Sequence, residues 1–508
     1  MTGNAVAGSV ATDRVQSLDW LLLAPVVVLV AALLAVLVTD AVLPGRRRLL
    51  DGLAVAGVLG AGAGLALAAA ARDLPAATLC TSAGPCSYVT SGLTVALQGT
   101  ALLAALVVLL LALDGPGARL RAEHHALLLA AVAGAVALAG ARDLATMVVA
   151  LETASLPVVG LVALRRDRRG AEAALKLLLV SVASLGVLLL GLALVYAATG
   201  TVHLQPLVGA GGEVAGPHRA LLLLGLGLVV AGAGFKLSAM PFGWWTPDVY
   251  AGSPPPVAAL LSTVSKVAAA AFVLVVLVLG APLLAGAWTV LVGVLAAVTM
   301  TVGNLVALRQ RVAVRLLAWS TVAQAGWVLL PLAGAAAGLA PAARAAAGYL
   351  LAYVVASLAA FTVVVLVARH HPDGERHTLE AHRGLVRREP VAAVALAFAL
   401  ACLAGLPPGV MGLVAKVVAL GPVVSAGGWL LAVVAAVNVA LGLAYYLRWG
   451  ALLLARPDEP DAAQQVAPRP TWDVTVGEGL ALGVSAGGCV ALSVLPALVA
   501  GPFGGLLG

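Results

Sequence analysis

The chain has 508 residues, of which 62% are hydrophobic and 10% are charged. Soluble domains carry about 45–50% apolar and about 25% charged residues, so this chain has too few polar residues to cover soluble domains. Its apolar content also excludes a disordered chain. The composition therefore predicts a polytopic membrane protein. The formal charge of +7 is expected to lie in loops rather than on a nucleic-acid-binding surface.

A length of about 20 apolar residues per spanning helix predicts an all-α fold with fourteen transmembrane segments. The first segment is expected to be a retained helix and not a cleaved signal, because one basic residue precedes it. The fourth and fifth nearly abut, with Ala141, Arg142 and Asp143 between them. The predicted segments are 19–41, 50–71, 92–113, 124–141, 143–164, 171–198, 218–242, 254–280, 284–308, 312–338, 342–369, 390–420, 427–455 and 474–500.

The 25 arginines test this count, because cytoplasmic loops collect basic residues. With the N-terminus outside, 20 arginines fall in cytoplasmic loops and 5 in external ones. A wrong number of helices would erase this bias, so both termini are expected outside. Cys80 and Cys86 then share an external loop, where a disulfide between them can form. Cys402 and Cys489 lie in apolar runs and are expected to be inert.

Prolines interrupt two predicted helices in a similar way. The seventh contains GFKLSAMP (234–241), and the twelfth contains GLPPGVMG (405–412), followed by Lys416. Proline removes a backbone donor and clashes with the preceding turn, so both helices are expected to break. Ordinary kinks would account for the prolines, but not for a lysine beside each break. Broken helices in two halves are typical of inverted-repeat transporters. We therefore expect helices 1–3 at 1–123, two five-helix repeats at 124–280 and 281–455, and a C-terminal loop and helix at 456–508.

All four lysines lie within apolar segments: Lys176, Lys236, Lys266 and Lys416. Lys176 is close enough to a helix end to reach the interface. Lys266 lies near the middle of a helix expected to be unbroken, where a charge costs at least about 2.5–3.5 kcal/mol. Glu152 is the carboxylate near the centre of a helix.

A carboxylate favours the charged form of a lysine and burial disfavours it, so a movable pair can load and release a proton. A static salt bridge would account for only one of the amines. All eight histidines lie in loops or at predicted helix ends, so a proton path is expected to use Lys, Glu, hydroxyls and water. The sequence has no metal-ligand cluster, dinucleotide fingerprint or Walker motif, and neither a redox cofactor nor nucleotide hydrolysis is expected in this chain.

Four stretches resemble subunit N of bacterial proton-pumping NADH:quinone oxidoreductase, respiratory complex I. They are DLATMVVALETASLP (143–157), GFKLSAMPFGWWTPDVYAGSPPPVAALLSTVSKVA (234–268), GNLVALRQRVAVRLLAWSTVAQAGW (303–327) and LAGLPPGVMGLVAKVVAL (403–420). The resemblance covers about residues 90–455. It implies an antiporter-like subunit of a bacterial cell membrane that translocates protons. Partner subunits would carry FMN, iron–sulfur clusters and quinone, and antiporter-like subunit M and small subunit K would be its neighbours.

The resemblance assigns a proton-translocating role to Glu152, which pairs with Lys236, and to Lys266 and Lys416; it gives Lys176 a modulatory role. We expect the Glu152 carboxylate within about 4–6 Å of the Lys236 amine, a range over which opposite charges interact strongly. Lys266 and Lys416 should lie along one inward-facing polar track.

The chain departs from the family at two positions, Gly243 and Gln324, where the family often has histidine. Neither residue titrates, so bound water would have to replace those histidines in a proton path. Two rivals remain open at this point. One is a subunit of a sodium/proton antiporter, against which the TPDVYAGSPPPV stretch argues, and the other is a purely structural membrane scaffold.

The arginine bias predicts the topology directly. A reporter fused after Arg169 or within 370–389 should report a cytoplasmic location, and one within 200–217 an external one. Reporter activity on both sides of the membrane measures this, and a reversed pair would contradict the fourteen-helix arrangement.

Overall fold

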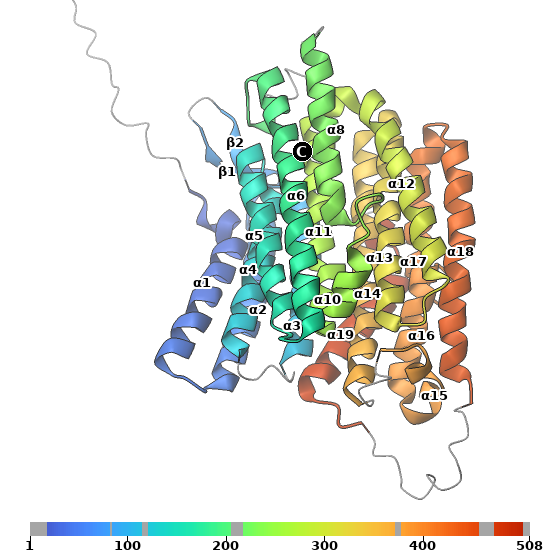
Figure 1. Cartoon of the computed structure of the whole chain (residues 1–508). Helices are drawn as coiled ribbons and strands as arrows, with labels where there is room; N and C mark the ends of the chain where they lie inside the picture. Colours follow the sequence, from blue (N-terminus) through green and yellow to red (C-terminus); the bar gives the residue numbers. More distant parts are fainter. Residues whose placement is uncertain are drawn as a thin grey trace, which may run out of the picture.

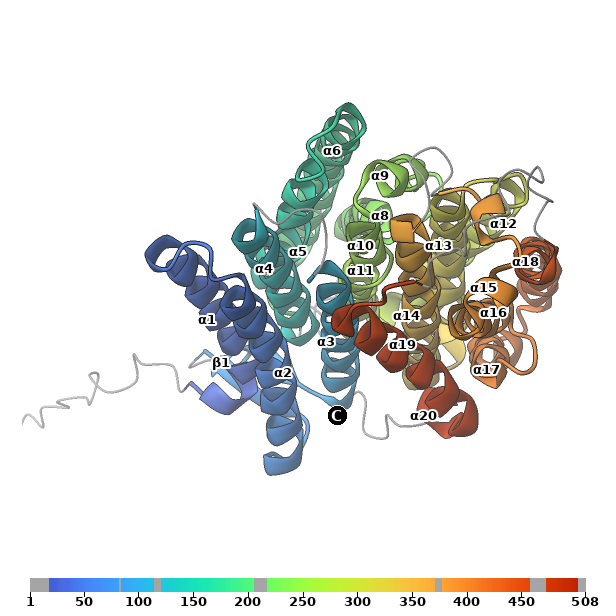
Figure 2. The same cartoon turned by 90° about the horizontal axis from the view of Figure 1, so that it is seen from below.

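The computed structural model describes residues 18–81, 84–113, 120–204, 217–370, 377–456 and 472–500. Long helices lie side by side, with α1 (Trp20–Val42) at one end of the bundle and α18 (Trp429–Leu454) at the other (Figure 1). Near the C-terminus the chain returns to the middle, where α19 (Val476–Val494) packs against α3 (Gly92–Ala112) and α14 (Leu339–His370) (Figure 2). The fold is all-α apart from a short hairpin.

The remaining helices follow in chain order. They are α2 (Arg47–Ala71), α4 (Arg121–Gly140), α5 (Leu144–Ala163), α6 (Arg168–Thr199), α8 (Pro217–Leu237), α9 (Thr246–Gly252), α10 (Pro255–Ser262), α11 (Val264–Leu274), η1 (Val275–Gly280), η2 (Pro282–Leu284), α12 (Ala285–Ala307), α13 (Ala313–Leu329), η3 (Leu330–Ala337), η4 (Glu380–His382), α15 (Leu385–Arg388), α16 (Pro390–Ala404), α17 (Val410–Ser425) and α20 (Ala497–Ala500).

Within the described ranges, thirteen helical segments are long and apolar enough to cross a membrane by length and composition. The predicted twelfth segment is divided between α16, with 15 residues, and α17, with 16, and neither is long enough alone. Because these two helices follow each other through one predicted span, they supply the fourteenth. The predicted all-α membrane fold is confirmed, as is the separation of α4 from α5 by residues 141–143.

Both predicted breaks are present. The seventh segment was expected to be helical to residue 242, but α8 ends at Leu237 and the chain stays non-helical until α9. In the twelfth segment the break separates Ala404 from Val410. Each break leaves backbone groups without helical partners in the interior, where side chains can use them.

The expectation of an unbroken eighth helix is wrong. Helices α10 and α11 are separated at Thr263, whose φ of −122° and ψ of −82° are not helical. The Thr263 hydroxyl donates to the Ala259 carbonyl at 2.6 Å, a back-bond that competes with the helical ladder. Lys266 therefore lies one turn beyond an irregularity and not in the middle of a regular helix.

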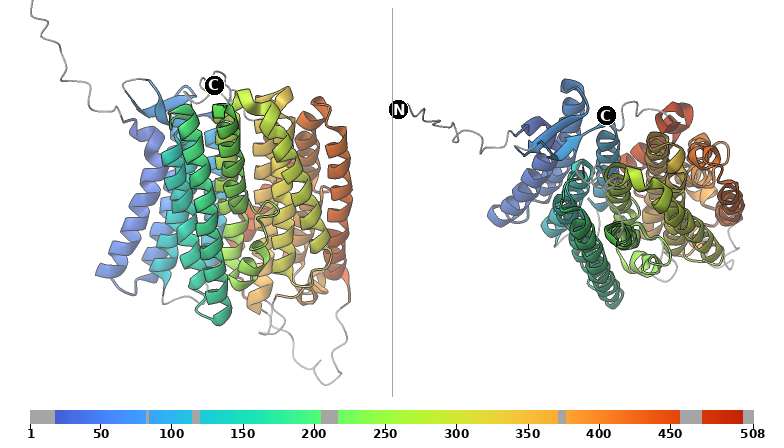
Figure 3. Two further views of the ribbon diagram at one scale, coloured as in Figure 1. Left: turned by 45° about the horizontal axis from the view of Figure 1, so that its top comes forward. Right: turned by 90° about the horizontal axis from the view of Figure 1, so that it is seen from above.

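The loop expected between the second and third helices contains a two-stranded antiparallel hairpin, β1 (Ala76–Cys80) and β2 (Cys86–Thr90). Cys80 and Cys86 pair across it and are joined by a disulfide, with their Cα atoms 3.8 Å apart. The sequence allowed this bridge without deciding it, and the structure contains it. The hairpin and the arginine-bearing turn between α1 and α2 lie at opposite ends of the bundle, as the alternation of loops requires (Figure 3).

Close packing of α6 on α8 depends on glycines. A Cβ at Gly191 would lie 2.7 Å from the Gly225 carbonyl oxygen, and one at Gly225 would lie 2.9 Å from the Gly191 carbonyl oxygen. A Cβ at Gly232 would lie 2.9 Å from the Leu188 nitrogen. Membrane helices approach closely through such small residues, because packing and not the hydrophobic effect drives their association. This crossing holds the end of α8 that carries Lys236 against α6.

We expect Gly225→Val to destabilise the subunit, because its side chain would meet the α6 backbone. Overpacking of this kind costs about 1–3 kcal/mol, and more where the obstacle is backbone. The matched control is Gly227→Val on the same helix, where a Cβ would have no atom within 4 Å. The yield and thermal midpoint of the assembled complex measure the effect. Equal losses in the two variants would contradict the role of the crossing.

Candidate functional site

Glu152 and Lys236 form a buried ion pair between α5 and α8. Asp143 caps α5 by accepting a 2.8 Å hydrogen bond from the Thr146 amide, which fixes the start of the helix nine residues before Glu152. Glu152 Oε1 lies 3.0 Å from Lys236 Nζ, and the two side chains are 14% and 6% exposed. The amine also donates to Ser181 Oγ on α6 at 2.9 Å. The predicted proximity of the two charges is confirmed.

Lys266 is held at the end of α8. Its amine donates to the Lys236 carbonyl at 3.0 Å and to Ser238 Oγ at 2.6 Å, and it lies 5.0 Å from the centre of the Trp245 ring. Its side chain is 1% exposed, so it faces inward as predicted. Because the Lys236 backbone binds Lys266 while the Lys236 side chain binds Glu152, one residue joins the ion pair to the central lysine.

Lys416 has an equivalent environment at the end of α16. Its amine donates to the carbonyls of Leu403 at 3.0 Å and Ala404 at 2.5 Å, and it lies 5.5 Å from the centre of the Trp327 ring. Its side chain is 6% exposed. The last carbonyls of a helix lack helical donors and carry partial negative charge, so they suit a buried ammonium group. Each break thus provides acceptors for one lysine.

The two helix ends share one backbone motif. At the end of α8, the Ser238 amide donates to the Phe235 carbonyl, and the Ala239 amide donates to the Gly234 carbonyl. At the end of α16, the Gly405 amide donates to the Cys402 carbonyl, and the Leu406 amide donates to the Ala401 carbonyl. This is the Schellman pattern, whose residue after the helix adopts a left-handed conformation. Ser238 has a φ of 66° and Gly405 a φ of 79°. A serine in this conformation is strained, whereas glycine is not.

A cluster of buried hydroxyl groups gathers around Ser262. One turn before Lys266, the Ser262 hydroxyl lies 3.0 Å from Thr321 Oγ1, 2.8 Å from Tyr353 Oη and 2.8 Å from Ser357 Oγ. Tyr353 also donates to Thr321 Oγ1 at 3.0 Å. These groups come from α10, α13 and α14, and all are buried.

Gln324 connects this cluster to the second break. It lies one turn after Thr321 on α13. Its Nε2 donates to Tyr446 Oη at 3.2 Å and to the Leu403 carbonyl at 3.4 Å. Its Oε1 accepts a hydrogen bond from the Tyr349 hydroxyl. The Leu403 carbonyl also accepts from Lys416, so the amide and the lysine share one acceptor. Buried polar groups thus lie one turn from Lys266 and at the carbonyl that binds Lys416, while a continuous polar track between the two lysines stays a prediction.

Where the family often has histidine, the structure shows two different situations. Gln324 makes the contacts just described and is 3% exposed. At Gly243, a Cβ would lie 2.3 Å from the Ser238 carbonyl oxygen, so no side chain fits without movement of the backbone. The glycine belongs to the packing of the first break.

Lys176 lies apart from these polar groups. Its side chain is 45% exposed and pairs with Glu172 at 2.8 Å and with Asp248 at 3.3 Å, and Asp248 also pairs with Arg315 at 3.0 Å. These contacts join α6, α9 and α13 near the end of the bundle. Lys176 is thus a surface lysine here, in keeping with its expected reach to the interface.

Sequence reasoning missed the neutral members of the site. These are Ser181, Ser238, Trp245, Ser262, Thr321, Trp327, Tyr349, Tyr353, Ser357 and Tyr446. Single hydroxyls and aromatic rings are common in membrane helices, and their convergence depends on tertiary packing. The two adjacent tryptophans after the first break, Trp244 and Trp245, were an available signal, because aromatic faces attract buried cations.

The chain matches the family model described as "NADH:quinone oxidoreductase/Mrp antiporter, TM" over residues 141–442. It is 45% identical to NADH-quinone oxidoreductase subunit N 2 of Streptomyces griseus, over 92% of this chain and 90% of that protein. It is 41% identical to subunit 14 of the Thermus thermophilus enzyme, over 75% of this chain and 81% of that protein.

Solved structures with the same fold include two from respiratory and antiporter complexes. Respiratory complex I from Thermus thermophilus has a chain that matches with a TM-score of 0.77 and 35% identity, over 94% of this chain and 98% of that one. The Mrp complex from Dietzia sp. matches with a TM-score of 0.80 but 22% identity, over 95% of each chain, and so shows likeness of fold alone.

The chain belongs to the subunit N family of NADH-quinone oxidoreductase. It is an antiporter-like, proton-translocating membrane subunit of that enzyme. The family model and the fold are shared with Mrp antiporters, whereas the identities of 41–45% are to NADH-quinone oxidoreductase subunits. Within the described residues, no group of three or more His, Cys, Asp or Glu side chains could hold a metal ion.

Replacing Ser238 should separate folding from transport. Ser238→Gly removes the hydroxyl that Lys266 binds but suits the left-handed backbone, so the complex should assemble at least as well as the wild type and pump fewer protons per electron. Ser238→Ala removes the same hydroxyl and retains the strain, so it should show the same pumping defect without the gain in stability. Thermal midpoints and proton uptake by inverted vesicles measure the two effects. Normal pumping in Ser238→Gly would contradict a role for this hydroxyl.

Proposed function

We propose that protons are carried through this subunit by Glu152, Lys236, Lys266 and Lys416, with Glu152 and Lys236 as a movable pair and Lys266 as the proton store. The observation that carries the proposal is the double use of Lys236. Its amine lies 3.0 Å from the Glu152 carboxylate while its carbonyl accepts from Lys266 at 3.0 Å. A shift at the end of α8 would therefore alter the surroundings of both amines at once.

Lys416 would be the far end of this path, reached through the hydroxyl cluster and Gln324. The matching helix ends at Lys266 and Lys416 support the division into repeats at 124–280 and 281–455. We assign Lys176 at most a modulatory role, since its partners are exposed carboxylates.

Neighbouring subunits would cover both ends of the path. Glu152 lies on the same face of α5 as Val149 and Leu156, which are 67% and 48% exposed. A carboxylate facing lipid is costly, so this face is better suited to contact another protein. At the other end, Val417, next to Lys416, is 61% exposed. Small subunit K and antiporter-like subunit M are the neighbours we propose.

The remaining parts of the proposal concern the assembled enzyme. FMN, the iron–sulfur clusters and the quinone site would belong to partner subunits, which oxidise NADH and reduce quinone. The subunit would lie in the bacterial cell membrane with both termini outside, because that orientation puts 20 of the 25 arginines on the cytoplasmic side.

Lys266→Ala should leave the complex assembled but reduce proton pumping at least tenfold, with NADH:quinone turnover falling alongside if coupling is tight. Lys266→Arg keeps a charge but holds its proton more firmly, so it should restore packing better than pumping. Proton translocation per electron in inverted vesicles is the measurement.

The matched comparison uses the exposed pair on α6. Lys176→Ala should have a much smaller effect than Lys266→Ala, and Glu172→Gln a much smaller effect than Glu152→Gln. An assembled Lys266→Ala enzyme that pumps normally per electron would overturn the assignment. If Lys266→Ala prevents assembly of the complex and does not act on pumping itself, the result would favour a purely structural role for the subunit.

A further inference from the structure

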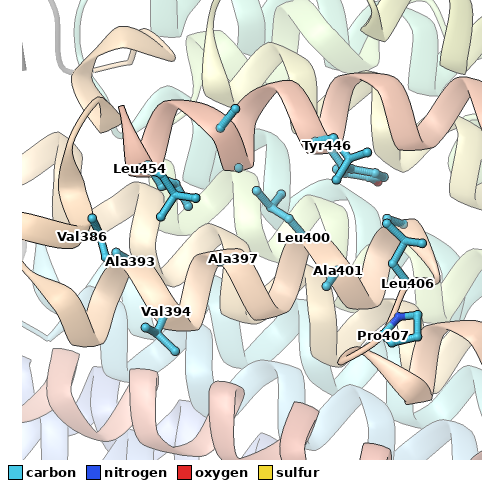
Figure 4. Close-up of a pocket in the computed structure, with 15 residues that line it drawn as sticks. Val386, Ala393, Val394, Ala397, Leu400, Ala401, Leu406, Pro407, Tyr446 and Leu454 are labelled. Atoms are coloured by element: carbon cyan, nitrogen blue, oxygen red, sulfur yellow. The ribbon is translucent and has the colours of Figure 1, made fainter. Parts of the chain in front are cut away.

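An apolar groove of about 450 Å³ runs between α16 and α18. Val386 and Leu454 line one end, and Leu406, Pro407 and Tyr446 line the other (Figure 4). Its volume falls within the range of about 300–1,000 Å³ that is typical of ligand sites. Leu447 and Leu454 are 57% and 67% exposed along its edge, so the groove opens sideways to the surroundings of the bundle.

The groove has the length and lining of an acyl-chain site. It follows α16, whose 15 residues extend about 22 Å. One leaflet, headgroups included, is about 20–22 Å deep, so the groove spans the depth of one leaflet. Apart from Tyr446, its lining side chains are apolar. The small side chains of the alanines at 393, 397 and 401 leave space along the face of α16 that lines the groove. A long, unbranched apolar occupant fits this shape.

Two arginines are neighbours in sequence of residues that line one end of the groove. Arg387 follows Val386 directly and Arg456 lies two residues after Leu454, and both are exposed. Two other arginines near this end bind backbone carbonyls. Arg388 donates to the Arg383 carbonyl at 2.6 Å, and Arg448 donates to the Gln310 carbonyl at 2.6 Å. Basic residues between transmembrane helices recognise anionic lipid headgroups.

The inner end of the groove meets the buried polar groups at Tyr446. The ring lines the groove, while the hydroxyl lies 2.5 Å from Ser320 Oγ and accepts from Gln324 at 3.2 Å. The groove also ends at the break between α16 and α17, whose carbonyls bind Lys416. An occupant would therefore support the side of the second break that the rest of the chain leaves open.

We propose that an anionic phospholipid is a bound component of this subunit, with one acyl chain in the groove between α16 and α18 and its headgroup at Arg387 and Arg456. The acyl chain packs against Tyr446 and α16, and so holds the second break in place. This inference is independent of the route that protons take.

Filling the groove tests the acyl chain. Gly450 lines it, and no atom lies within 4 Å of a Cβ built there, so Gly450→Leu should fold normally and occupy the space. We expect the purified complex to lose one phospholipid per subunit, counted by native mass spectrometry. Ala397→Leu on the opposite wall should do the same. The control is Gly483→Leu on α19, which also has no neighbour within 4 Å and lies outside the groove.

Removing the charges of these two arginines tests the headgroup. Arg387→Gln and Arg456→Gln should each reduce the preference of the complex for phosphatidylglycerol over phosphatidylcholine about fivefold in exchange with mixed vesicles, because each basic residue near an anionic surface adds to the attraction. Arg47→Gln with Arg48→Gln, in the first turn of α2, is the control and should leave the preference unchanged.

Two results would overturn the inference. One is an unchanged phospholipid count in both Gly450→Leu and Ala397→Leu. The other is a structure of the assembled complex in which a neighbouring subunit fills the groove. Loss of pumping in Lys266→Ala bears on the proton path alone, and retention of the lipid in that variant would separate the two proposals.

Discussion

The structure depends on the attraction between a buried lysine and the end of a broken helix. The Schellman pattern satisfies two carbonyls at the end of α8 and of α16 but leaves the final carbonyls without donors. Lys266 donates to one such carbonyl at the first break, and Lys416 donates to two at the second. An ammonium group and an unpaired carbonyl are each costly in an apolar interior, and together they stabilise both the charge and the break.

Much of the remaining fold keeps these helix ends in position. The glycine crossing of α6 and α8 brings Ser181 to the Lys236 amine, and Trp245 and Trp327 cover the two lysines. Gly405 allows the turn after α16 and leaves room for Lys416, since a Cβ there would lie 3.0 Å from Lys416 Cδ. The first break uses Ser238 instead. The hydrogen bonds of the Ser238 hydroxyl with Lys266 and Thr246 offset the strain of its left-handed backbone conformation.

Charges and prolines within apolar runs could be recognised in the sequence, because both are rare and costly there. They identified Glu152, the buried lysines and both breaks. The interruption at Thr263 could not be predicted, since serine–threonine pairs also occur in regular helices and this one acts through a local back-bond. The convergence on Gln324 depends on contacts between segments distant in sequence, which composition does not reveal.

The groups between Lys266 and Lys416 impose a constraint on transport. They are hydroxyls and one amide, and none of them changes its charge near neutral pH. Among the described residues, these neutral groups offer a proton no titrating side chain on which to rest between the two lysines. In the proposed function, the two lysines would then act as separate storage sites whose states influence each other through charge. Any direct transfer requires water to enter beside Gln324. The helix break next to Lys416 is the place where freed backbone groups could bind that water.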